Sequence, residues 1–253
     1  MSKICRFFSV MVTLLLMLMI GSPWVHAQMK TPDTSSLNSS ITQASSSQQP
    51  HPFPFPPVIY PNVNKYLIEN HVLPAHTVKD RRMNTLPKLS YKEGTYKGII
   101  IHEVGEDNRT LPQWVDRMYA TYDKAFVHAF VDANEIHLTA PEQFYVWGAG
   151  KKANPYFYQI ELVRTYTFKD FAQSVNNQAW LAAYMLKKNG LKPTLADDHH
   201  GQGTIISHNA VREYWGGTTH VDPISYYAQW GYDMHQFLDL VRYHYQNIPY
   251  DKF

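Results

Sequence analysis

Three side chains of metal-ligating type stand beside short apolar runs that lie far apart in the chain. His102 ends the run "GIII", His208 follows the run "TIIS", and Asp222 stands two residues after His220 in "THVDP". Two imidazoles and one carboxylate suit a zinc ion with one coordination position left open, and such an ion acidifies a bound water. The structural alternative is that the histidines cap strands by hydrogen bonding, while Asp222 before Pro223 forms an ordinary turn.

A fourth candidate, Glu161, interrupts the apolar segment "QIELV". A carboxylate in such a strand either faces a solvated cleft or is buried at high cost. Beside a metal site it would be placed to act as a general base that takes a proton from the attacking water. The alternative is that Glu161 lies on the polar face of an edge strand.

The segments around these residues predict a domain of intermixed strands and helices. Apolar runs predict strands within 97–103, 157–163 and 203–209, and the alternation on either side of "DANE" predicts a hairpin within 125–141. Helical periodicity predicts helices within 110–123, 167–190 and 232–247. We therefore expect an α/β (α+β) fold in which a mixed central β-sheet is flanked by α-helices.

Residues 1–27 have the pattern of a secretory signal peptide. Lys3 and Arg6 precede the apolar run Phe7–Ile20, and "VHA" supplies small residues before a cleavage site after Ala27. An uncleaved membrane anchor is the alternative, but the apolar run is short for a span. We accordingly expect a secreted, extracellular protein.

The remaining chain divides by composition. Residues 28–60 are rich in Ser, Thr, Gln and then Pro, which predicts a linker, and residues 61–253 are expected to form one globular domain. The single cysteine, Cys5, precedes the predicted cleavage site, so the mature protein would lack disulfides. Removing the two basic residues of the signal peptide lowers Lys+Arg from 23 to 21, against 21 Asp+Glu. This balance gives no indication of a nucleic-acid partner.

Three segments together resemble the zinc-dependent N-acetylmuramoyl-L-alanine amidase family, which has the type 2 amidase or peptidoglycan-recognition-protein fold. They are "GIIIHE", the stretch from "FVHAFVDANEIHL" to "YQIELV", and "ISHNAVREYWGGTTHVDPISYYAQWG". The resemblance runs from Gly98 to Val241 with the motifs in the family's order. The ending "HVDP…Y…WG" is most similar to the autolysin and phage-endolysin branch.

The resemblance implies a role for each candidate. One Zn²⁺ would be held by His102, His208 and Asp222, with Glu161 as the catalytic base. The family often carries Lys two residues before the third ligand, where its charge stabilises the oxyanion. This chain has His220 there, which leaves open whether the donor is charged or neutral.

Two further residues, His128 and Trp147, fall where the family lines its substrate groove. Ordinary packing within the hairpin region is the alternative for both. We interpret the aromatic run "YYAQW" as packing residues of the helix that follows Asp222.

The implied reaction is hydrolysis of the amide between the lactyl group of N-acetylmuramic acid and L-alanine of the stem peptide. The expected protein is a cell-wall-associated monomer whose partner is peptidoglycan, with no nucleic acid and no membrane anchor after signal cleavage. Two alternatives remain open. One is a non-catalytic peptidoglycan-binding module of the same fold, and the other is a secreted zinc peptidase that cuts within the stem peptide.

Overall fold

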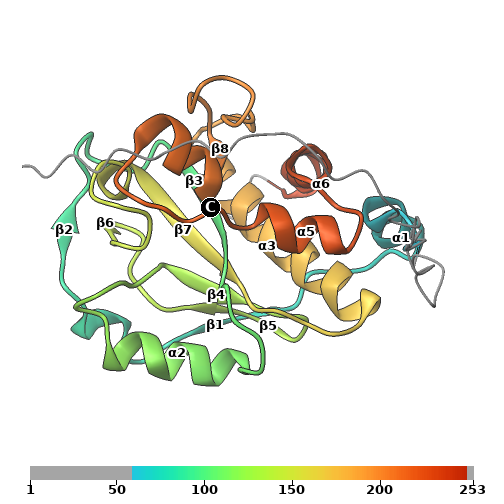
Figure 1. Cartoon of the computed structure of the whole chain (residues 1–253), viewed down its shortest axis with the longest axis horizontal. Helices are drawn as coiled ribbons and strands as arrows, with labels where there is room; N and C mark the ends of the chain where they lie inside the picture. The colour runs from blue at the N-terminus through green and yellow to red at the C-terminus, as the bar shows by residue number, and fades with distance from the viewer. Residues whose placement is uncertain (1–58, 250–253) are drawn as a thin grey trace, which may run out of the picture. The chain divides into compact units, whose positions relative to one another are not determined.

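A six-stranded mixed sheet forms the centre of the computed structural model, which describes residues 59–249 (Figure 1). The predicted signal peptide and nearly all of the predicted linker lie outside the described residues. In spatial order the strands are β1 (His76–Lys79), β5 (Glu135–Leu138), β4 (Ala129–Val131), β7 (Phe157–Leu162), β3 (Gly98–Glu103) and β8 (Ile205–Ser207).

The four strands at one side of this sheet, β4, β7, β3 and β8, run parallel. β4 and β5 form the antiparallel hairpin predicted around "DANE", and β1 joins β5 in parallel. A separate two-stranded antiparallel ribbon pairs β2 (Leu89–Ser90) with β6 (Phe144–Tyr145). The prediction of a mixed central sheet is therefore confirmed.

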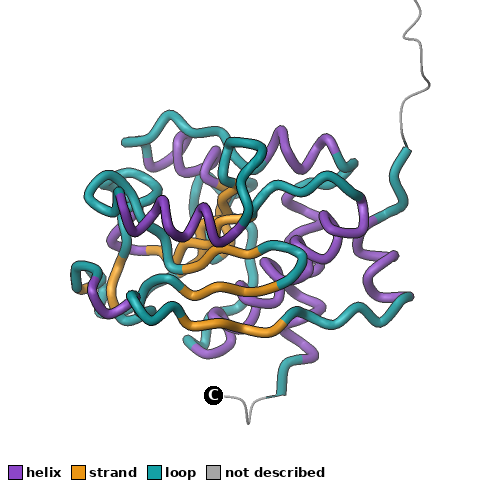
Figure 2. The backbone as a smooth tube through the Cα atoms, turned by 90° about the horizontal axis from the view of Figure 1, so that it is seen from below, coloured by secondary structure: helices purple, strands orange, loops and turns teal. Residues whose placement is uncertain are grey.

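Helices cover both faces of the sheet (Figure 2). The α-helices are α1 (Val63–Glu69), α2 (Leu111–Ala120), α3 (Phe168–Lys188), α4 (His208–Ala210), α5 (Ile224–Gln229) and α6 (Met234–Asn247). Single turns of other helix types are η1 (Met83–Thr85), η2 (Asn154–Tyr156) and the π-helical η3 (Val211–Trp215). No helix within residues 59–249 is long and apolar enough to cross a membrane.

The largest apolar core lies on the face covered by α3, with α1, α5 and α6 packed beside it (Figure 1). α2 covers the opposite face, where Trp114 and Met118 pack against Phe130 and other apolar side chains. Threonines cap the N-termini of α3 and α2: Thr167 Oγ1 accepts from the Asp170 N–H at 3.1 Å, and the Gln113 side chain accepts from the N–H of Thr110 at 2.9 Å.

One polar residue of α3, Gln178, ties this helix to the sheet. Its amide nitrogen donates to the carbonyl oxygens of His102 and Ile160, both at 3.0 Å, and its amide oxygen accepts from the Tyr227 hydroxyl at 2.6 Å. Gln178 is fully buried, so each of these bonds satisfies a group that would otherwise be costly to bury. The contact lies at the ends of β3 and β7, where the site residues begin.

Candidate metal centre and catalytic site

The carboxyl ends of the parallel strands bring three of the predicted residues together. His102 on β3 is the register partner of Glu161 on β7, and Ile101 is the partner of Ser207 at the end of β8. His208 follows directly as the first residue of α4. The open edge at the carboxyl ends of parallel strands is where α/β proteins place ligand sites.

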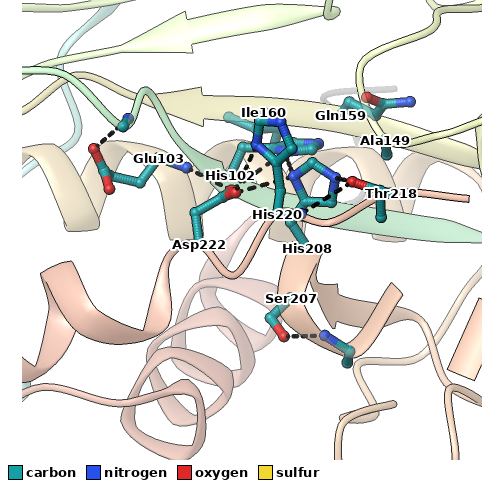
Figure 3. Close-up of polar contacts among 12 residues, drawn as sticks. His102, Glu103, Ala149, Gln159, Ile160, Ser207, His208, Thr218, His220 and Asp222 are labelled. Carbon is teal, nitrogen blue, oxygen red and sulfur yellow. Dashed lines mark hydrogen bonds and ion pairs between the residues drawn. The ribbon is translucent and has the colours of Figure 1, made fainter. Parts of the chain in front are cut away.

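Three ligand atoms converge at this edge (Figure 3). The Nδ1 atoms of His102 and His208 are 3.0 Å apart, His208 Nδ1 lies 3.0 Å from Asp222 Oδ1, and His102 Nδ1 lies 3.4 Å from Asp222 Oδ2. Ligand atoms of a tetrahedral zinc site are separated by about 3.3 Å, given Zn–N bonds near 2.0–2.1 Å. The three donors are thus spaced to share one ion.

Asp222 reaches the centre on the loop that follows η3, and the end of β3 fixes its carboxylate. Its Oδ2 accepts from the backbone N–H of Glu103 at 3.2 Å, while its carbonyl accepts from the N–H of Asn209 at 3.0 Å. Burial opposes its ionisation, but the close imidazoles of His102, His208 and His220 outweigh that effect and hold the pKa of Asp222 well below its usual range. The turn at Asp222 and Pro223 and the ligand role of Asp222 are therefore compatible, because this turn directs the carboxylate toward His102 and His208.

The ring of His208 is neutral at pH 7. Burial, with the neighbouring His102 ring as a second cause, lowers the pKa of His208 to about 4. A neutral imidazole keeps a lone pair for a metal ion. His102 is only 1% exposed, and its Nε2, which faces away from the ligand cluster, has no hydrogen-bond partner among residues 59–249.

Glu161 projects beside this centre. Its Oε2 is buried and has no hydrogen-bond partner within the described part of the chain. Burial, reinforced by the charges of Asp222 and Glu103, raises the pKa of Glu161 well above its ordinary value. A carboxyl whose pKa is raised in this way accepts a proton more readily than an ordinary glutamate, as a general acid–base group must.

His220 lies at the mouth of the same centre. Its ring stacks on His208 with ring centroids 4.8 Å apart, and its Nδ1 is 3.6 Å from Asp222 Oδ1. The nearby Asp222 carboxylate raises the pKa of His220, which favours the charged form of the ring. With 69% of its side chain exposed, His220 can reach a bound molecule without leaving Asp222.

Two cavities meet at His220. A cavity of about 310 Å³ is lined by Glu161, Phe130 and Trp114, and a larger one of about 1120 Å³ contains Trp147 in its wall. Lys124, Ala125 and His220 line both. The arrangement can therefore hold a molecule that extends to both sides of the metal-ligating cluster.

The family described as N-acetylmuramoyl-L-alanine amidase matches residues 92–225, more than half of the chain, and this range includes the three converging ligands, Glu161 and His220. The chain belongs to this amidase family.

Individual relatives agree with that assignment. Protein Ami of Listeria monocytogenes serotype 1/2a is 42% identical over 202 residues, which cover 76% of this chain and 22% of Ami. A bifunctional autolysin of Staphylococcus aureus (strain NCTC 8325 / PS 47) is 37% identical over 189 residues, which cover 74% of this chain and 15% of the autolysin. The chain thus spans less than a quarter of the length of these curated relatives.

Among solved structures, the crystal structure of the Staphylococcus aureus hydrolase AmiA in complex with its ligand superposes with a TM-score of 0.69 and 35% identity. The superposition covers 76% of this chain and 93% of the AmiA chain. This chain and AmiA therefore share the whole domain fold, whereas the two longer relatives share one segment with it.

His128 does not line the substrate groove, contrary to what the resemblance to the family implies. Its side chain is fully buried, its ring stacks on Tyr158 at 4.1 Å, and its Nε2 lies 2.9 Å from the Tyr91 hydroxyl. Burial lowers its pKa to about 3, so the ring is neutral. The expectation that His128 lines the groove is wrong, because its side chain points into the core beneath the hairpin; the packing alternative holds for this residue.

The sequence interpretation missed Thr218, whose Oγ1 lies 2.9 Å from Nε2 of His208. It also missed Gln178, which fixes the ends of β3 and β7. The only feature of the sequence that pointed to Thr218 was its position four residues before Asp222. Gln178 was marked only as a polar residue on the buried face of a predicted helix.

Proposed function

We propose that this chain is a zinc-dependent peptidoglycan hydrolase that cleaves the amide between N-acetylmuramic acid and L-alanine of the stem peptide. One observation carries the proposal: His102, His208 and Asp222 present three converging ligand atoms beside Glu161, a half-buried residue whose Oε2 has no hydrogen-bond partner in the described residues. The amidase family is zinc-dependent in general, and the donor set of two imidazoles and one carboxylate is the kind that zinc hydrolases use.

His102, His208 and Asp222 would hold the ion. Their charges sum to −1, so a bound Zn²⁺ would keep a net positive charge at the centre. When bound, the ion would acidify a water molecule and polarise the scissile carbonyl. The backbone N–H of Glu103 and the buried position of both imidazoles keep the three donors in place before the ion arrives.

Glu161 and His220 would perform the proton and charge chemistry. Glu161 takes the proton of the attacking water, and its raised pKa lets it return that proton to the leaving amine. His220, whose pKa is raised and which is exposed at the mouth, donates a hydrogen bond to the oxyanion that develops on the scissile carbonyl. The raised pKa of His220 supports the charged form as the counterpart of the family's Lys.

The two joined cavities would hold the glycan side and the peptide side of the scissile amide, with Trp147 in the wall of the larger one. The signal-peptide pattern of residues 1–27 supports export, and a wall polymer is the substrate that an exported amidase of this family would meet. We propose that the secreted domain acts as a monomer at the cell wall.

The test is digestion of purified peptidoglycan, with and without a chelator, followed by mass spectrometry of the soluble products. We expect stem peptides with a free L-alanine amine and muramic acid with a free lactyl carboxylate, and we expect the chelator to abolish both. New termini within the stem peptide would instead establish a peptidase. Binding without any product would establish a non-catalytic module.

A further inference from the structure

One hydroxyl group, that of Thr218, connects the ligand His208 with the larger cavity. Thr218 Oγ1 lies 2.9 Å from His208 Nε2 and accepts from the backbone N–H of His220 at 3.3 Å (Figure 3). The same half-buried residue lines the larger cavity. Thr218 therefore touches the metal-ligating cluster on one side and the open cavity on the other.

The positions of the protons follow from the ring geometry. His208 presents Nδ1 to His102 and Asp222, so a neutral His208 that uses the Nδ1 lone pair for a metal carries its proton on Nε2. That proton is donated to Thr218 Oγ1. A partner of this kind fixes the tautomer and the orientation of a ligating histidine.

The hydroxyl oxygen then has no acceptor capacity left. It offers two lone pairs, and the N–H groups of His208 and His220 occupy both. The O–H bond of Thr218 must therefore point away from both of these N–H groups, and no acceptor for it is found among residues 59–249. The open direction is the cavity that Thr218 lines.

Close backbone packing holds Thr218 in this position. Gly217 and Gly150 both have positive φ, 83° and 89°, and a Cβ atom on Gly150 would lie 2.4 Å from the carbonyl oxygen of Gly217. Only a residue without a side chain allows this contact between the two loops. The loop that carries Thr218 is thereby packed against a second segment that lines the larger cavity.

We propose that Thr218 has two roles. It orients His208 for the metal by accepting a hydrogen bond from the Nε2–H group, and its hydroxyl donates a hydrogen bond to an amide oxygen of the substrate in the larger cavity. The proposal rests on the proposed function. It predicts that a single substitution weakens both zinc affinity and substrate binding, although Thr218 is not itself a ligand.

The experiment compares Thr218→Val with Thr218→Ser and with Thr219→Val. Valine keeps the shape of threonine but neither accepts nor donates, serine keeps the hydroxyl, and Thr219 is the exposed neighbour with no hydrogen bond to His208. Zinc affinity is measured by competition with a fluorescent chelator. We expect Thr218→Val to lose about 10- to 100-fold in zinc affinity, and the other two variants to stay within about threefold of wild type.

The second readout is hydrolysis of a soluble muropeptide at zinc concentrations that saturate every variant. Thr218→Val is expected to raise KM by about 3- to 10-fold, the loss of one hydrogen bond, and Thr218→Ser to restore it. Chemical unfolding of the metal-free proteins checks that the variants fold, and Thr218→Ala replaces the valine variant if it does not.

Each part of the proposal has its own refutation. Wild-type zinc affinity in Thr218→Val, or in Thr218→Ala in its place, would overturn the orienting role, and an unchanged KM would overturn the donor role. A wild-type protein without zinc affinity or amidase activity would overturn the proposed function instead, so the two failures are distinguishable.

Discussion

Replacing His220 with alanine is expected to slow turnover without emptying the metal site. Removing one donor to an oxyanion costs about 10²–10³ in kcat, or about 2.7–4 kcal/mol. His220 has 69% of its side chain exposed, so water can take its place in part, and we expect a loss near the lower limit, about 10². Its Nδ1 is 3.6 Å from Asp222 Oδ1, farther than the ligand contacts, so zinc should stay bound.

The assay measures zinc stoichiometry and muropeptide turnover on the same preparations. His220→Lys should recover part of the lost rate, because positive charge is the property that the raised pKa of His220 supplies. If His220→Ala lost its zinc, the reasoning from geometry would be wrong and His220 would have to be counted as a ligand. If His220→Lys were no faster than His220→Ala, charge would not be the operative property.

Three further predictions concern the ligands, the linker and stability. Asp222→Ala should lose both zinc and activity, while Glu161→Gln should keep its zinc and lose about 10²–10⁴ in kcat, as judged by metal analysis and turnover; zinc loss in the glutamine variant would contradict these roles. A truncation that begins at Ile59 should unfold cooperatively and cleave muropeptides as the full chain does, because the described domain begins there; non-cooperative unfolding would refute it. Buried neutral His128 and His244, with pKa values lowered to about 3 and about 4, leave the unfolded chain binding more protons below pH 6.5. As the pH is lowered from 6.5 to about 4, the free energy of unfolding should therefore fall by about 1.4 kcal/mol per pH unit for each ring. In denaturant titrations, the free energy of unfolding of His244→Gln should depend less steeply on pH than that of the wild type.

Patterns of buried residues are what made the main elements predictable. β3 and β7 are apolar runs, and α3 shows helical periodicity with a threonine cap and Gly190 just past its end. β1 was not predicted, because three of the four residues in "HTVK" are exposed and an edge strand needs no apolar pattern. The two-residue strands β2 and β6 are too short to leave any period.

The candidate site was predictable only where a regular element delivers a residue. His102 and His208 stand at strand ends, so the parallel order of the strands brings them together. Asp222 arrives on a loop, whose course no periodicity encodes; its residue type made it a candidate ligand, and the resemblance to the amidase family supported that role. His128 shows the converse error: its position beside a strand was clear, but whether its ring faces a groove or the core depends on packing against Tyr91 and Tyr158.

Gln178 and Glu161 both carry buried polar atoms, but only Gln178 has partners for all of them within the described residues. Gln178 is fully buried and has all of its contacts made, as a structural amide should. Six buried side-chain atoms have no hydrogen-bond partner in the described residues, and Oε2 of Glu161 is the only carboxylate oxygen among them. Burying a carboxylate oxygen without a partner is costly, so stability alone would favour an apolar residue at such a position. Glu161 persists among apolar neighbours of β7, and the proton chemistry proposed for it supplies the reason that packing does not.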